Sequence, residues 1–204
     1  IGVRLVGSEM CIRDSLSESN KIPNWLLNRW KRDWAKNYND IITEHLNLNP
    51  PIDLYVKNDA NYWAKKLNGK KLGNNCVRLY TPGLISSLEG YEVGEWWIQD
   101  YSSQIPVSLL EIQSNDDVLD LCAAPGGKTA QLISLGAKVT SLDNNEKRLF
   151  RLKQNLKRLN YQAIIENKDI RNFSLQKTWP KIILDAPCSS TVSYTHLRAH
   201  ETDS

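Results

Sequence analysis

The segment DLCAAPGGKT (120–129) combines a carboxylate, a thiol, a lysine and a run of small residues. Small residues let the polar atoms of a ligand approach backbone N–H groups at a helix start, as in the nucleotide sites of open α/β folds. A phosphate-binding P-loop would need Gly five residues before Gly127, where this sequence has Cys122, and the dinucleotide fingerprint G-x-G-x-x-G is absent. The segment therefore predicts a polar-ligand loop of another kind, with a tight structural turn as the alternative.

Three further carboxylates follow apolar segments that read as strands. Asp143 ends the second such segment, Asp169 follows the third and Asp185 ends the fourth. In nucleoside-binding α/β folds, an acid placed like Asp143 accepts hydrogen bonds from the ribose hydroxyls. A single acid after a strand is usually a helix cap or a turn residue. Three acids at successive strand ends instead predict one ligand-binding edge.

A thiol lies at the same predicted edge, in the segment LDAPCSS (184–190). Cys188 follows Pro187 and is a candidate nucleophile, although a buried structural cysteine is the commoner fate of a free thiol. Cys122 is interpreted as a small residue that fits its loop, and Cys76 as a core or surface residue. The four cysteines show no paired spacing, so the sequence predicts no metal site and no disulfide framework.

The elements that must position these residues alternate along the second half of the chain. Apolar periodicity predicts strands over 118–121, 139–142, 163–165 and 182–184, with helices over 128–135 and 145–159. Alternating strands and helices indicate a parallel sheet with helices on its faces, that is, an α/β fold. Upstream, the patterns predict two short helices within 16–50, a strand over 52–56, a helix over 62–67 and a small mixed α/β segment reaching about residue 100.

Composition is typical of a globular chain. Hydrophobic residues make up 41% and charged residues 24% of the 204 positions, and no apolar run is long enough to span a membrane. The start of the chain does not resemble a signal peptide. We therefore expect a cytoplasmic protein without a membrane partner, and a monomer. The net charge of +3 is compatible with an RNA partner but does not require one.

Four segments together resemble a known family. DLCAAPGGKT, SLDNNEKRL, NKDIRNF and LDAPCSS, in this order and spacing, are similar to motifs of the bacterial Sun/RsmB-type RNA (cytosine-5)-methyltransferases. The resemblance covers roughly 20–191, and EWWIQDYSSQIP (95–106) is similar to the segment before the family's catalytic sheet. It implies a Rossmann-like class I methyltransferase fold, incomplete here because C-terminal strands are missing. A helical linker and a small α/β subdomain are expected to precede that fold.

The resemblance also implies ligands and residue roles. The cofactor would be S-adenosylmethionine and the substrate RNA, most simply small-subunit rRNA. The loop Cys122, Ala123, Ala124, Pro125, Gly126, Gly127 and Lys128 would wrap the methionine part of the cofactor. Asp143 would hold the ribose, Asp169 would lie near the adenine, and Asp185 would lie between the methyl donor and the cytosine ring.

The chemistry of cytosine C5 explains why such enzymes need a thiol. C5 is a poor nucleophile, whereas thiolate addition at C6 makes an enamine that can attack the sulfonium methyl; a base then removes the C5 proton and the thiol leaves. By position alone, Cys188 is the candidate for this attack. The family instead uses a second Cys in a downstream Thr-Cys-Ser setting, which is not found in this sequence, and assigns product release to the Cys matching Cys188.

Both ends of the sequence differ from this pattern. Segments 1–15 and 192–204 are similar to translated sequencing adapters, with natural tails as the alternative. Between them we expect a helical linker over 16–50 to an upstream RNA-binding domain. A pre-catalytic subdomain over 51–110 and the N-terminal half of the methyltransferase domain over 111–191 would follow. Such a fragment is expected to be inactive or poorly soluble, because its fourth strand would form an open sheet edge.

Other functions stay open on the sequence alone. The chain could be an inactive S-adenosylmethionine- or RNA-binding module, a methyltransferase for tRNA cytosines, or a methyltransferase acting on another substrate. The helix predicted over 145–159 carries six basic residues that could contact RNA phosphates, although a solvated helix face is the commoner reason for such a charge run.

Overall fold

The computed structural model describes residues 22, 24–45, 51–173 and 178–186. The described residues fall into two compact units, one within 22–45 and the other within 51–186. In the first unit, the described elements are α1 (Asn24–Asp33) and α2 (Tyr38–His45). Both lie in the segment where sequence periodicity predicts two short helices. Within the part of the chain that the structure describes, every helix is too short or too polar to cross a lipid bilayer.

The second unit begins with a small antiparallel sheet. Its strands β1 (Ile52–Val56), β2 (Lys70–Lys71), β3 (Cys76–Leu79) and β4 (Trp96–Ile98) pair in the order β2-β3-β1-β4. Helix α3 (Ala60–Lys66) and the short 3₁₀ turn η3 (Ile85–Ser87) pack on one face, around a core that includes Leu54, Val77 and Trp96. The sequence predicts β1 and α3 but not the remaining strands, which are short and separated by glycine-containing turns.

A parallel sheet follows, as the alternating sequence pattern predicts. Its strands are β5 (Asp117–Leu121), β6 (Lys138–Asp143), β7 (Ile164–Asn167) and β8 (Lys181–Leu184), in the order β7-β6-β5-β8. All three pairings are parallel, so the carboxyl ends of the strands share one edge. The Rossmann-like α/β class expected from the sequence is confirmed.

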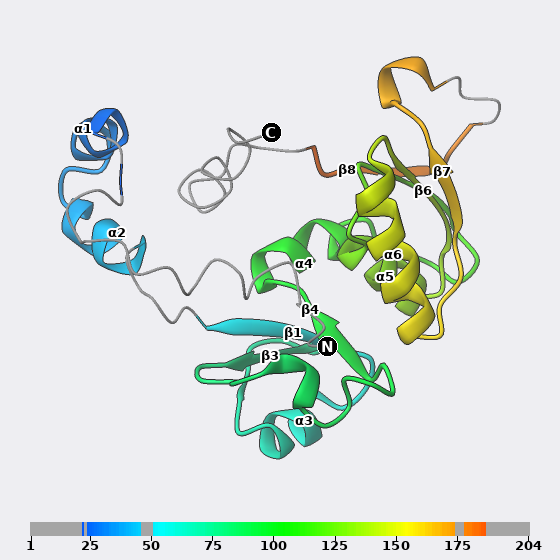
Figure 1. The fold of residues 1–204 in the computed structure, drawn as a ribbon, viewed down its shortest axis with the longest axis horizontal. Coiled ribbons are helices and arrows are strands. Elements are labelled where there is room, and N and C mark those ends of the chain that lie inside the picture. The colour runs from blue at the N-terminus through cyan, green and yellow to red at the C-terminus, as the bar shows by residue number, and fades with distance from the viewer. Residues whose placement is uncertain (1–21, 23, 46–50, 174–177, 187–204) are drawn as a thin grey trace. The chain divides into compact units, whose positions relative to one another are not determined.

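Helices cover one face of this parallel sheet. These are α4 (Tyr101–Ser108), α5 (Gly127–Ser134) and α6 (Glu146–Arg158), and Figure 1 shows α5 and α6 beside the strands of this sheet. Leucines at three- and four-residue spacing on α6 point into the core with Ala130 of α5. On the opposite face, Leu119, Leu121 and Leu142 contact Phe173 and Trp179, which belong to the segment containing the 3₁₀ turn η4 (Ile170–Asn172).

The antiparallel and parallel sheets are joined by buried aromatic and polar contacts. Tyr55 of β1 stacks on Trp97 of β4 with ring centroids 4.6 Å apart, and both pack against residues of α5 and α6. Lys57 Nζ donates to the carbonyl of Leu159 at 2.6 Å, and Arg158 donates to the carbonyls of Tyr91 and Trp96. These bonds attach α6 to the antiparallel sheet. They thereby help to position the carboxyl edge of the parallel sheet.

Candidate functional site: the carboxyl edge of the parallel sheet

The loop between β5 and α5 approaches its surroundings closely. Cys122 and Gly126 both have left-handed backbone angles, with φ of 60° and 104°. A side chain at Gly126 would place its Cβ 3.1 Å from Cγ of Leu152, so only glycine combines this angle with this contact to α6. The strand, loop and helix predicted from 120–129 are present, and Lys128 carries the first long side chain after β5.

Side chains from neighbouring elements hold this loop. The N–H of Ala124 donates to Oδ2 of Asp143 at 3.2 Å, and the Arg148 guanidinium donates to the carbonyl of Ala124. Two turns further along α6, Asn155 Nδ2 donates to the carbonyl of Pro125 at 2.9 Å. The loop is thus attached to β6 and α6 by hydrogen bonds to its backbone.

Asp143 lies at the end of β6 and is almost completely buried. Besides the Ala124 N–H, its carboxylate accepts the N–H of Asn145 at 3.0 Å, and Arg148 Nη2 lies 3.6 Å from Oδ2. A carboxylate has about four acceptor positions, so this one retains capacity for a hydroxyl donor. Its side chain is only 2% exposed. A ribose can therefore reach this carboxylate only by displacing some of the residues that surround it.

Asp169 and Asp185 lie beyond the ends of β7 and β8, and both already have cationic partners. Asp169 accepts the N–H of Arg171 at 2.9 Å and its Nη2 at 2.6 Å, and these hydrogen bonds lower the pKa of the carboxyl below its ordinary value. Asp185 accepts Lys128 Nζ at 2.6 Å, which links the end of β8 to α5. The three acids predicted to share one edge do so, with Asp185 the most exposed of them.

A fourth carboxylate, which the sequence reasoning did not single out, lies beneath the loop. Asp120 of β5 has no solvent-exposed surface; its Oδ2 accepts the Thr129 hydroxyl at 2.6 Å, while Oδ1 has no partner among the described residues. Burial raises its pKa to about 7. The sequence does contain a signal for Asp120. It is an acid inside the apolar strand VLDL (118–121), and a buried charge is costly unless it is paired.

Three buried glutamines connect β4, α4 and α5 below the same loop. Gln99 Nε2 donates to Gln131 Oε1 at 2.7 Å, Gln131 donates to the carbonyl of Gln104 at 2.9 Å, and Gln104 donates to the carbonyl of Gln99 at 2.8 Å. The Trp97 indole N–H donates to Gln99 Oε1 at 2.9 Å. Since all three amides are bonded, the network gives α5 a defined position relative to the antiparallel sheet. No simple sequence pattern identifies it.

The two described cysteines do not have the properties of activated nucleophiles. Burial, and next the negative charge of Asp143, raise the pKa of the Cys122 thiol. Burial raises the pKa of Cys76 to about 11. Thiols with raised pKa values are mostly protonated at neutral pH and react slowly. Cys188 lies outside the described residues. Within them, no group of three or more His, Cys, Asp or Glu side chains is placed to hold a metal ion.

This arrangement suits a polar, nucleoside-like ligand. It places carboxylates at successive strand ends next to a loop of small residues at the N-terminus of α5. In open α/β sheets, ligands bind outside the carboxyl ends of the strands.

Comparison with known proteins agrees with this geometry. The family described as "16S rRNA methyltransferase RsmB/F" matches residues 107–201. Ribosomal RNA small subunit methyltransferase B of Yersinia pestis bv. Antiqua (strain Angola) is 35% identical over 184 residues. The Yersinia pseudotuberculosis protein of the same name is also 35% identical. Each match covers 83% of this chain and 43% of the relative, so the chain spans less than half the length of these curated relatives.

Solved structures show the same fold. A methyltransferase homolog protein from Pyrococcus horikoshii is 27% identical with a TM-score of 0.68, over 84% of this chain and 62% of that one. NSun6 from the same organism, solved with SFG, has a TM-score of 0.70 at 19% identity, over 83% and 71% of the two chains. With the carboxyl-edge geometry, the sequence matches support an RsmB/Sun-type rRNA methyltransferase, and the solved structures show the shared fold.

Proposed function

We propose that this chain carries the S-adenosylmethionine site of an RNA (cytosine-5)-methyltransferase that acts on small-subunit rRNA in the cytoplasm. The observation that carries the proposal is the grouping of Asp143, Asp169 and Asp185 at one sheet edge, beside the loop 122–128. The names of the Yersinia relatives support the choice of rRNA. We further propose that the protein acts as a monomer.

The residues at this edge fit the proposed cofactor. The loop Cys122, Ala123, Ala124, Pro125, Gly126, Gly127 and Lys128 would hold the methionine part. Asp143 would accept the ribose hydroxyls with its remaining acceptor positions, and Asp169 would lie near the adenine. When bound, the cofactor supplies an electrophilic methyl group.

The remaining residues act on the base. Asp185 would accept a hydrogen bond from the cytosine ring edge, and its bond to Lys128 holds its carboxylate near the loop. We propose that Cys188 takes part in product release and that another thiol attacks C6. In this scheme the unreactive Cys122 serves only to form the loop.

The cofactor assignment is tested by calorimetric titration with S-adenosylhomocysteine. Asp143→Ala removes two charge-assisted hydrogen bonds to the ribose and is expected to weaken binding about a hundredfold, or ~3 kcal/mol. Glu92→Gln, an exposed acid in the loop before β4, is the matched control and should bind like the parent. Absence of binding by the parent chain would contradict the assignment.

The role of Cys188 is tested by gel electrophoresis of the protein after incubation with substrate RNA and S-adenosylmethionine. In a longer version of the protein that contains the downstream attacking Cys, Cys188→Ala should accumulate a covalent protein–RNA adduct, because release is slowed while attack is retained. If the variant forms less adduct than the parent, Cys188 is the attacking thiol and the assigned role is wrong.

A further inference from the structure

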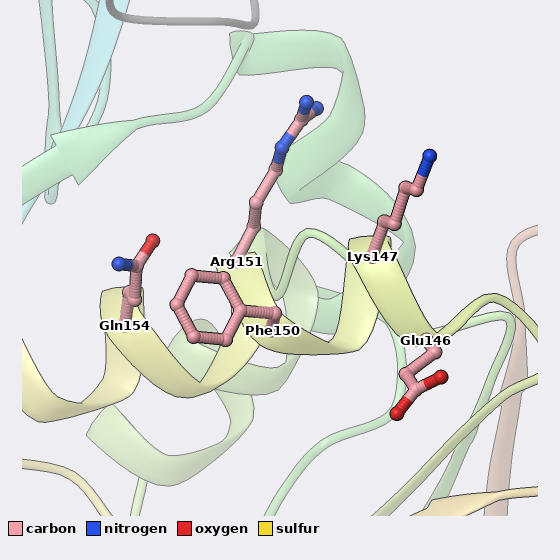
Figure 2. Close-up of a pocket in the computed structure, with 5 residues that line it drawn as sticks. All are labelled: Glu146, Lys147, Phe150, Arg151 and Gln154. Atoms are coloured by element: carbon pink, nitrogen blue, oxygen red, sulfur yellow. The ribbon is translucent and has the colours of Figure 1, made fainter. Parts of the chain in front are cut away.

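The outer face of α6 presents one exposed aromatic ring. Phe150 is 61% exposed, more than any other aromatic side chain among the described residues. It lines a hollow of about 420 Å³ together with Glu146, Lys147, Arg151 and Gln154. Figure 2 shows all five side chains projecting from α6, with the Phe150 ring between Gln154 and Lys147. A single exposed apolar residue is ordinary on a protein surface, so its surroundings must decide its significance.

The structure divides the basic residues of α6 into two groups. Arg148 and Arg158 are engaged, the first with Asp143 and the carbonyl of Ala124, the second with backbone carbonyls before and within β4. The other four are exposed and form no ion pair with any described residue: Lys147, Arg151, Lys153 and Lys157. The helix contains a single acid, Glu146. Its outer face therefore carries an excess of positive charge that the described residues do not neutralise.

Helical spacing places this charge around the ring. Lys147 precedes Phe150 by three residues and Lys153 follows it by three, so both flank the ring on the same face. Gln154, four residues on, adds an amide that can donate and accept hydrogen bonds. From Lys147 to Lys157 the helix rises about 15 Å. This basic strip begins directly after Asp143 and Asn145, at the carboxyl edge of the parallel sheet.

We propose that the outer face of α6 is a binding site for single-stranded RNA, in which a base stacks on Phe150 and phosphates bind the four exposed cations. An aromatic platform beside a cationic track is the combination that binds single strands without sequence preference. One ring is too small an apolar surface for a protein docking patch, and the charge sign excludes a basic partner. The choice of RNA as the polyanion rests on the proposed function.

The site is tested by fluorescence anisotropy with an unstructured 12-nucleotide oligouridine across a series of salt concentrations. Phe150→Ala should weaken binding about tenfold through lost stacking. The double variant Lys147→Gln/Arg151→Gln should reduce the slope of log K against log salt by about 1.4, or ~0.7 for each phosphate contact. Tyr80→Ala and Lys70→Gln/Lys71→Gln remove an equally exposed ring and two exposed cations elsewhere, and should leave both quantities unchanged.

Several outcomes would overturn the proposal. Unchanged RNA affinity in Phe150→Ala would exclude stacking, and an equal loss in the control variants would indicate general charge attraction. Tighter binding of an acidic peptide or of anionic lipid vesicles than of RNA would assign the face to another partner. S-adenosylhomocysteine affinity is measured in parallel, and all these variants should retain it. Failure of the parent to bind that ligand would contradict the proposed function, while the RNA measurement would still decide the α6 site.

Discussion

The antiparallel and parallel sheets differ in how their buried carboxylates are bonded. In the antiparallel sheet, buried Asp53 accepts Arg78 Nε at 2.6 Å and Nη2 at 2.8 Å, and the N–H of Tyr101 at 3.0 Å. Burial opposes the ionised form of Asp53, but these bonds outweigh it and lower its pKa. In the parallel sheet, buried Asp120 has one hydroxyl partner and one unpartnered oxygen, and its pKa rises.

We infer from this difference that Asp53 supports the fold, whereas the acids of the parallel sheet are available for a ligand. An ion-paired carboxylate such as Asp53 holds β1, β3 and α4 together, and these elements fill three of its roughly four acceptor positions. The under-bonded acids of the parallel sheet lie at or below its carboxyl edge, where a ligand is expected. Incomplete bonding is costly in a folded protein, and at Asp120 it occurs directly below the edge where a ligand is expected.

The largest effect is expected from breaking the buried pair of the antiparallel sheet. Arg78→Ala would leave the Asp53 carboxylate buried without its cation and should lower the free energy of unfolding by about 3–5 kcal/mol in urea titrations. Lys66→Ala, which breaks the exposed pair between Lys66 and Glu89, is the control and should change stability little. Equal losses of stability in the two variants would mean that the buried pair contributes no more than the exposed pair.

The junction between the sheets is tested at Gly94, which has φ of 70° and contacts the end of α6. A Cβ there would lie 2.2 Å from the carbonyl oxygen of Arg158, so Gly94→Ala should cost ~3 kcal/mol by forcing the backbones apart. Gly83 has a similar φ of 66° with open space around it, and Gly83→Ala should cost only about 1 kcal/mol. A smaller loss at Gly94 than at Gly83 would mean that the junction is loosely packed.

The glutamine network should have an intermediate effect that links the two sheets. Gln99→Leu leaves the Trp97 indole N–H and Oε1 of Gln131 without partners and should cost about 2 kcal/mol in thermal unfolding. Because α5 then loses its defined position, S-adenosylhomocysteine affinity should also fall. A stability loss without any change in affinity would limit the network to a purely structural role.

A further effect concerns the pH dependence that Asp120 contributes to stability. Because the folded-state pKa of about 7 lies above the ordinary Asp value, the folded protein binds more protons, and this group's stabilising contribution falls as pH rises from about 4 to 7. Asp120→Asn mimics the protonated acid and should remove this decline. Urea titrations of both proteins at pH 5 and pH 8 measure the difference; parallel pH profiles would mean that Asp120 keeps an ordinary pKa.

Regular patterns made the parallel sheet predictable. The alternation of apolar segments and leucine spacing indicates β5–β8, α5 and α6 to within a few residues at each end. The antiparallel sheet was predicted poorly because its strands are short and pair across distant parts of the chain. In β1 the alternation of Ile52, Leu54 and Val56 predicts one buried face, yet Asp53 and Tyr55 are buried as well. Arg78 and Trp97 cover that second face.

By itself, the sequence determined the family resemblance, the α/β class and the acids that gather at one edge, because these follow from local periodicity and from short motifs with fixed spacing. Only the tertiary structure decided which charges are bonded. It showed Asp143 enclosed by its neighbours, Asp120 beneath the loop, and α6 divided into engaged and exposed cations. Hydrogen-bond partners and burial arise from contacts between residues far apart in the chain, and a linear pattern does not encode them.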